Sequence, residues 1–111
     1  MPLSEKARVE VYLPDLPKPA YQELLAALDQ EFTSYTFGGC TIVRGLEGSY
    51  LSQAGFKLQD RITLIDTDTP YGFKENFEII SRYADKLREA AFRVLEEEAI
   101  LIVVLAVYHA T

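Results

Sequence analysis

The residues best suited to chemistry are one arginine and one glutamate that lie among tyrosines. They are Tyr12, Arg44, Glu47, Tyr50 and Tyr108. A cleft with aromatic walls and one Arg–Glu pair would suit a small, partly apolar anion. Tyrosine and arginine are also enriched in protein–protein interfaces. We favour the interface interpretation and keep the cleft as the alternative.

Two carboxylates form a second candidate, because Asp66 and Asp68 are two residues apart. On a strand this spacing places both side chains on one face. Such a pair can hold Mg²⁺ or Ca²⁺, or share a proton so that one pKa rises. No calcium-loop pattern follows them, and Asp and Thr commonly cap turns. A metal site at Asp66 and Asp68 is therefore the less favoured interpretation, and the sequence predicts no cofactor.

The single histidine and the single cysteine are weaker candidates. His109 lies near the end of the sequence, without a cysteine or acidic cluster at ligand spacing. It could serve as a lone general base, but we expect an exposed side chain. Cys40 precedes an apolar strand pattern and has no histidine partner in the sequence. We interpret it as a small buried hydrophobic residue.

A glycine-rich stretch runs from Tyr35 to Tyr50 and holds four of the six glycines, Gly38, Gly39, Gly45 and Gly48. Glycine supplies the backbone freedom needed for bulges, tight turns or the close approach of a ligand. No phosphate-loop pattern fits, and the stretch precedes a strand instead of opening a helix. We expect bends in a long hairpin, with a ligand cradle as the alternative.

Six elements must position these residues. After a frayed segment over residues 1–7, alternating or β-branched patterns predict strands at 8–13, 40–51, 61–66 and 99–108. Helical spacing predicts one helix between Tyr21 and Phe32 and a longer one over 74–97. The order β-α-β-β-α-β predicts a ferredoxin-like α+β fold. Residues 1–111 would form one domain, with two helices on one face of a four-stranded antiparallel sheet.

The predicted last strand is apolar on both faces, although the helices can cover only one. The first strand directs Arg8, Glu10 and Tyr12 away from the helices. In the last strand Ile100, Ile102, Val104 and Ala106 point one way and Leu101, Val103, Leu105 and Val107 the other, so one apolar set is left on the uncovered face. In this fold the last strand is usually also an edge, which invites pairing. We predict a homo-oligomer, a dimer or larger, joined through the open sheet face and the last strand. The alternative is that the C-terminal residues or the hairpin around 48–56 cover this face.

Composition excludes several classes of function. The 111 residues carry a net charge of −6, which argues against nucleic acid and anionic membranes. The longest apolar run, Ala99–Tyr108, is much shorter than the ~20 residues that span a bilayer. One cysteine and the absence of a signal-peptide pattern predict a cytoplasmic protein.

Three segments resemble small bacterial ferredoxin-like domains of unknown function. They are the Gly-Gly-x-Thr strand at Phe37–Thr41, the hairpin at Gly48–Tyr50 and the final Glu-Ala-aliphatic strand at Glu97–Val103. The layout is also similar to the PII proteins, ACT domains and antibiotic-biosynthesis-type monooxygenases, an analogy of fold alone. We therefore predict an oligomeric module that binds a protein partner or a small effector. The alternative is a small cofactor-free or metal-assisted enzyme, monooxygenase- or isomerase-like, with its cleft on the open sheet face.

Overall fold

The computed structural model describes residues 3–15, 17–51, 54–55, 57–95 and 100–110, with 35–36, 50–51 and 57–60 described by their backbone alone. The elements are β1 (Leu3–Pro14), α1 (Pro19–Gln30), the π-helical segment η1 (Glu31–Thr36), β2 (Thr41–Leu51), β3 (Lys57–Asp68), α2 (Phe77–Leu95) and β4 (Leu101–Ala110). This order confirms the predicted ferredoxin-like α+β fold. No helix among the described residues is long and apolar enough to cross a membrane.

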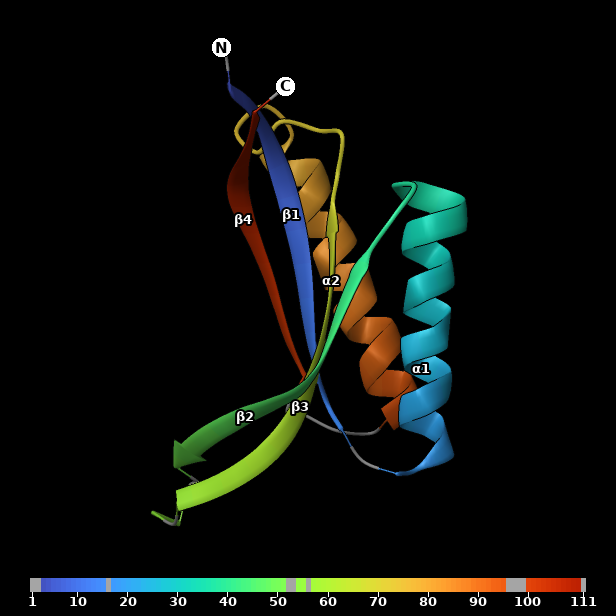
Figure 1. Ribbon diagram of the computed structural model, residues 1–111, viewed down its shortest axis with the longest axis vertical. Coiled ribbons are helices and arrows are strands. Elements are labelled where there is room, and N and C mark those ends of the chain that lie inside the picture. Colours follow the sequence, from blue (N-terminus) through green and yellow to red (C-terminus); the bar gives the residue numbers. More distant parts are fainter. Residues whose placement is uncertain (1–2, 16, 52–53, 56, 96–99, 111) are drawn as a thin grey trace.

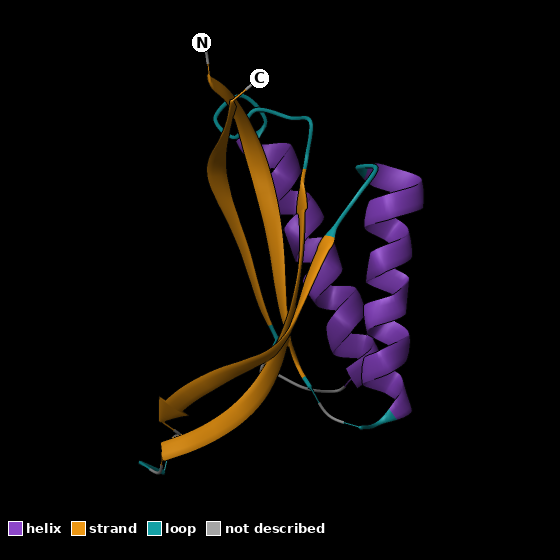
Figure 2. Cartoon of the chain, viewed as in Figure 1, coloured by secondary structure: helices purple, strands orange, loops and turns teal. Residues whose placement is uncertain are grey.

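The four strands form one antiparallel sheet in the order β2-β3-β1-β4. Both helices pack against the same face, and the other face stays open (Figures 1 and 2). The edges are β2 and β4, so the last strand lies at an edge as predicted. The β1 and β3 strands lie inside the sheet and have a neighbour on each side.

The hydrophobic core lies between the sheet and the helices. Alternation in β1 buries every second side chain, and Ala7, Val9, Val11 and Leu13 are at most 2% exposed. Opposite them, α1 contributes Tyr21, Leu24, Leu25 and Leu28, and η1 contributes Phe32, which is fully buried. The 3.6-residue period of α1 places its apolar residues on one side of the helix, and that side is the one that is buried.

The predicted frayed lead-in was wrong for its described part. Residues 3–7 belong to β1 and pair with Ala106–Ala110 of β4. The polar Ser4, Glu5 and Lys6 hid this strand from the hydrophobic pattern, because the partner strand, and not burial, holds this segment in place. The last strand likewise extends further than expected, to Ala110.

Beyond the end of β1 the sheet continues as a two-stranded arm. Pro14 pairs with Ile62, and the N–H of Asp15 still donates to Arg61 O at 2.8 Å. Beyond this, among the described residues, Glu47–Leu51 of β2 pairs with Lys57–Arg61 of β3. We call these two segments the arm. A register shift between Val43 and Leu46, with Gly45 at φ +76°, marks a bulge where β2 turns. The arm bends away from the helices (Figure 1) and lengthens the molecule to 48 Å.

Candidate functional site

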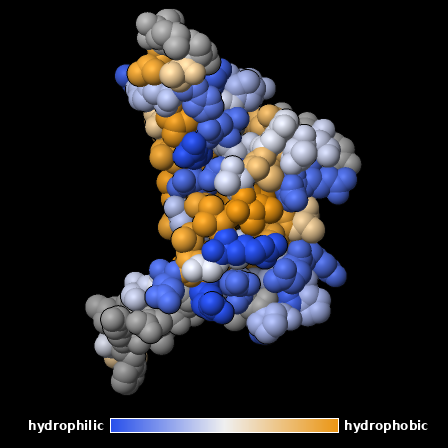
Figure 3. Space-filling model, in the orientation of Figure 1, coloured by the Kyte–Doolittle hydropathy of each residue, from blue (hydrophilic) through white to orange (hydrophobic). Residues whose placement is uncertain are grey.

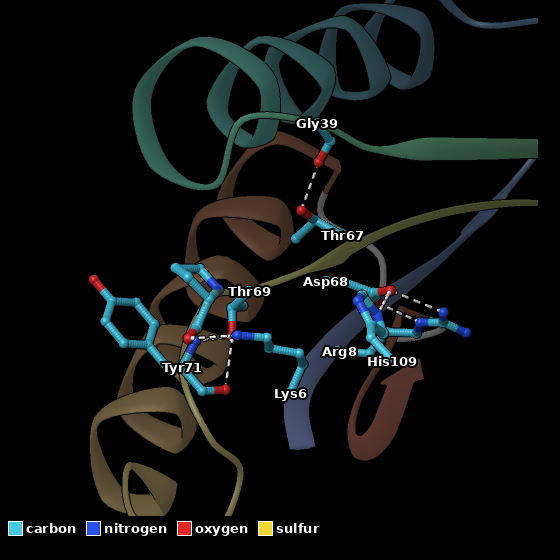
Figure 4. Close-up of polar contacts among 9 residues, drawn as sticks. Lys6, Arg8, Gly39, Thr67, Asp68, Thr69, Tyr71 and His109 are labelled. Atoms are coloured by element: carbon cyan, nitrogen blue, oxygen red, sulfur yellow. Dashed lines mark hydrogen bonds and ion pairs between the residues drawn. The ribbon is translucent and has the colours of Figure 1, made fainter. Parts of the chain in front are cut away.

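Charged residues of three strands form a connected group on the open sheet face. We call Arg8, Glu10, Asp66, Asp68 and His109 the polar cluster. Arg8 and Asp68 lie directly opposite each other in β1 and β3. The guanidinium donates through Nε to Oδ1 and through Nη2 to Oδ2, the latter at 3.0 Å (Figure 4). This is a bidentate, charge-assisted pair, the geometry in which arginine holds a carboxylate most firmly.

His109 joins the same carboxylate from β4. Its Nε2 lies 2.7 Å from Asp68 Oδ2. An ionised carboxylate only accepts hydrogen bonds, so Nε2 carries the hydrogen. The Arg8 hydrogen bond, opposed in part by desolvation and aided by the His109 bond, lowers the pKa of Asp68 below its ordinary value. We expected an exposed histidine, but His109 is half-buried and is held by Asp68, from a strand two places away in the sheet.

Asp66 is the one carboxylate of the polar cluster that receives no hydrogen bond from the described residues. It pairs in register with Glu10, a second negative charge. Burial raises the pKa of Asp66, and the charges of Asp68 and Glu10 raise it further while Arg8 lowers it. Like charges directly opposite in a sheet are unfavourable. Asp66 therefore feels the charge of Arg8 but has no hydrogen-bond donor of its own among the described residues.

Glu10 has a partner of its own. The Tyr12 hydroxyl donates to its Oε1 at 3.0 Å. Burial, and then this hydrogen bond, raise the pKa of Tyr12. Tyr12 therefore contacts the polar cluster on the open face and does not meet Arg44, as the alternative interpretation of an aromatic cleft had required.

A hollow of about 290 Å³ lies beside the cluster. Its walls come from β1, from the end of β3 and from the segment before β2; they are Arg8, Asp66, Thr67, Asp68 and residues 37–41. The hollow exists because β2 begins at Thr41, opposite Asp66. The edge of β3 at Thr67 and Asp68 therefore has no β2 neighbour.

The π-helical segment shapes the wall of the hollow. The carbonyl of Phe32 accepts hydrogen bonds from the N–H of Phe37 at 3.2 Å and of Gly39 at 3.1 Å. Gly38 has φ +84°, which glycine adopts readily, and Thr67 Oγ1 donates to Gly39 O at 2.6 Å. No atom lies within 4 Å of a Cβ added at Gly38 or Gly39. π-Helical turns are frequent at functional sites.

Cys40 differs from the buried hydrophobic residue that we predicted. It is half-buried, lines the hollow and donates through Sγ to Asp29 Oδ1 at 3.2 Å. Its Sγ also lies 3.7 Å from Thr33 Oγ1. Desolvation is the largest cause that raises the pKa of this thiol. The thiol is consequently a weak nucleophile at neutral pH.

The structure separates the remaining predicted site residues. Arg44 and Glu47 are exposed on β2, and neither has a hydrogen bond or ion pair with the described residues. Tyr50 is in the arm, with its side chain outside the described part. Tyr108 is 57% exposed and alternates with His109, so the two side chains leave opposite faces of β4. The predicted aromatic cleft is not assembled among the described residues of one chain.

The open face of β4 carries the predicted apolar row, which we call the apolar margin: Leu101, Val103, Leu105 and Val107. In register these residues lie opposite Tyr12, Glu10, Arg8 and Lys6 of β1. Leu101 is 57% exposed and the others are half-buried. Figure 3 shows hydrophobic residues along the side of the molecule where β4 lies. The described C-terminal residues continue β4 instead of folding back over this face.

The two aspartates considered for a metal do share the open face. Both oxygens of Asp68 are already engaged by Arg8 and His109. Within the described ranges, no group of three or more His, Cys, Asp or Glu side chains is arranged to hold a metal ion.

Comparison with solved structures finds CutA1 proteins. The divalent cation tolerance protein CutA1 from Thermus thermophilus is 19% identical, with 97% of this chain and 88% of that one covered and a TM-score of 0.61. CutA1 from Oryza sativa is 19% identical, with 98% and 85% covered and a TM-score of 0.61. No protein-family model matches the sequence, and no significant match is found among curated proteins. At this identity the likeness shows the fold alone, and the motif resemblance proposed from the sequence stays a prediction.

Proposed function

We propose that the protein is a non-enzymatic binding module that works as a homo-oligomer. Subunits would meet through the open sheet face and β4, and the hollow beside the polar cluster would take a small effector. The observation that carries the proposal is the apolar margin on an edge strand. We also propose a cytoplasmic location, on the evidence of the single cysteine.

Burial of the apolar margin against another surface would be favourable in free energy. Full burial of an aliphatic side chain contributes about 1.5–3 kcal/mol. Leu101 is 57% exposed, so in one chain it gains less than half of this free energy. The free edge of β4 also offers backbone groups for pairing. A second copy can cover both features, because a self-complementary surface repeats on every subunit.

The arm supports the same proposal. It consists of two strands without a helix against it (Figure 1). An isolated two-stranded hairpin is marginally stable in water. An arm that reaches onto a sister subunit would gain the third neighbour that it lacks in one chain.

Light scattering over a concentration series tests the proposal. We expect a mass that is a multiple of the 12.6 kDa subunit, and Leu101→Asp should shift it toward the monomer. Ile79→Asp is the matched control, because Ile79 is 63% exposed but lies on α2. A 12.6 kDa species at every concentration would reject the oligomer.

The alternative of a small enzyme has one specific observation in its favour. Asp66 lies in the hollow with a raised pKa, and general acids and bases are found among such residues. An enzyme would lose turnover in Asp66→Asn while it still bound its substrate. A binding module would lose affinity instead, and the two outcomes separate the alternatives.

A further inference from the structure

We infer that the hollow binds a small organic cation, a primary amine, through the carboxylate of Asp66. The inference names the chemical class of the effector and to that extent rests on the proposed function. It depends on the geometry of a single chain, since every wall of the hollow comes from one subunit. It can therefore be tested apart from the oligomer.

The charges around the hollow call for a cation. Glu10, Asp66 and Asp68 contribute three carboxylates and Arg8 contributes one guanidinium, while His109 binds Asp68 and not Asp66. Arg8 is committed to Asp68 through two hydrogen bonds. Glu10 accepts from Tyr12, so Asp66 is left without a donor among the described residues. A cation at Asp66 would neutralise the charge of this carboxylate and relieve its repulsion with Glu10.

Backbone acceptors beside Asp66 favour an ammonium group. The N–H of Thr69 donates to Ala7 O in β1. Successive residues of a strand direct their N–H and C=O groups to opposite sides, so those of Asp68 point to the edge that β2 leaves uncovered. A primary ammonium has three donors. One can bind the Asp66 carboxylate while another binds the Asp68 carbonyl.

The surface of the hollow is mostly polar, and one aromatic wall is available to contact the carbon chain of such a ligand. Phe37 lines the hollow, and its ring is held by Phe32 and Tyr83 at centroid distances of 6.2 Å and 5.4 Å. Gly38 and Gly39 leave free space where other residues would place a Cβ. A volume of about 290 Å³ lies at the lower end of the range for small-molecule sites.

A divalent metal ion fits less well. Ca²⁺ takes six to eight oxygen ligands and Mg²⁺ near-ideal octahedral geometry. The described residues offer no group of three side chains for such an ion. An ammonium needs only one carboxylate and one or two neutral acceptors. The Asp66 carboxylate and the Asp68 carbonyl are such groups.

The test is an amide-resolved NMR titration with butylamine, alongside tetramethylammonium and MgCl₂. Butylamine should shift the amides of Gly38, Gly39 and Thr41 in a saturable way. Tetramethylammonium has the same charge and no N–H, so it should bind at least tenfold more weakly. In Asp66→Asn the butylamine affinity should fall at least tenfold. Asp85→Asn, which removes an exposed carboxylate on α2, should leave it unchanged.

The unique cysteine gives a second readout. Cys40 lines the hollow and is the only thiol in the chain. Butylamine should slow its alkylation, followed by mass spectrometry, in the unchanged protein and in Asp85→Asn but not in Asp66→Asn.

Three results would overturn the inference. They are equal butylamine affinity in Asp66→Asn, equal affinity for tetramethylammonium, and displacement of butylamine by Mg²⁺ at equal concentration. Light scattering on the same samples reports the oligomer independently. Loss of the oligomer with intact butylamine binding would reject only the proposed interface, and the reverse result would reject only the ligand.

Discussion

The polar cluster and the arm both carry charged residues on strands, yet their surroundings differ completely. In the polar cluster, Arg8 lies on a central strand between β3 and β4 and binds Asp68 from one of them. On β2, Arg44 and Glu47 stand exposed, without partners among the described residues. The charged residues have partners in one region and not in the other because their strands differ in the number of neighbours. A central strand meets side chains from both sides, whereas an edge strand meets them from one.

We propose different functions for the two regions. The polar cluster is organised by contacts within one chain and borders a hollow, so it suits a small ligand. The arm and the apolar margin are incomplete within one chain, so they suit a second copy. The predictions below test this division.

The largest effect is expected at Phe32, whose carbonyl and ring hold the wall of the hollow. Phe32→Ala should lower the free energy of unfolding by about 3–5 kcal/mol, because a fully buried phenylalanine leaves a large cavity. Phe92→Ala is the matched control at 49% exposure, and it should change stability by about 0.5 kcal/mol or less. Urea unfolding measures both. Equal effects would show that the wall of the hollow is not part of the core.

The second-largest loss of stability is expected when the ion pair between Arg8 and Asp68 is broken. Hydrogen bonds to charged groups contribute about 1.5–3 kcal/mol, and Arg8 and Asp68 are partly exposed. Asp68→Asn should therefore cost about 1–2 kcal/mol, whereas Glu47→Gln on the arm should cost almost nothing. Urea unfolding at pH 7 measures the free energy of unfolding of both variants and of the unchanged protein. An equal cost for both would show that the polar cluster is no better connected than the arm.

The cost of Asp68→Asn should also depend on pH. Since folding lowers the pKa of Asp68, its contribution is complete above the unfolded value of about 3.9 and is lost as the pH falls through the folded value. The groups facing it are Arg8, His109 and Asp66. The stability difference between Asp68→Asn and the unchanged protein should therefore shrink below about pH 4. A difference that stayed constant down to about pH 2 would contradict the lowered pKa.

The third prediction uses one glycine from the wall of the hollow and one from the bulge that precedes the arm. Gly38→Ala and Gly45→Ala should each cost about 1–2 kcal/mol, since both have positive φ, +84° and +76°. Gly39→Ala does not have a positive φ and has free space for a methyl group, so it is the control for the cost in stability alone. Their functional effects should separate. Gly38→Ala should change butylamine binding in the NMR titration, and Gly45→Ala should change the mass seen by light scattering.

The smallest effect on folding is expected for Arg44→Ala and Glu47→Ala, within about 0.5 kcal/mol each. If the arm and the part of β2 just before it contact a sister subunit, these changes should instead raise the dissociation constant of the oligomer by about fivefold, about 1 kcal/mol. Sedimentation at several concentrations measures it. If assembly and every binding assay stay unchanged, this part of β2 is scaffold.

Local patterns were enough to predict the fold. Val9, Val11 and Leu13 alternate with polar residues, and the core-facing residues of α1 recur at helical spacing; both patterns follow from backbone geometry alone. The same logic showed that Leu101 and Val103 belong to different faces from Ile100 and Ile102. These features depend only on neighbours in the chain.

The candidate site was harder to predict. Asp66, Asp68 and His109 were singled out by residue type, but Arg8 was considered only as an outward-facing residue. Its role follows from its register opposite Asp68, and no local pattern specifies that register. The hollow depends on where β2 begins and on a π-helical turn, which the helical pattern of α1 does not reveal.

The amino-acid sequence by itself thus determined the elements, their order, the buried faces and the apolar last strand. These properties follow from periodicity and side-chain chemistry over short distances. Only the tertiary structure decided which charges meet. Asp68 lies 60 residues from Arg8 and 41 from His109 along the chain, and strand order and register bring the three together. The same pairing left Asp66 without a donor among the described residues and moved the best-supported ligand site from the glycine-flanked Arg44 to the end of β3.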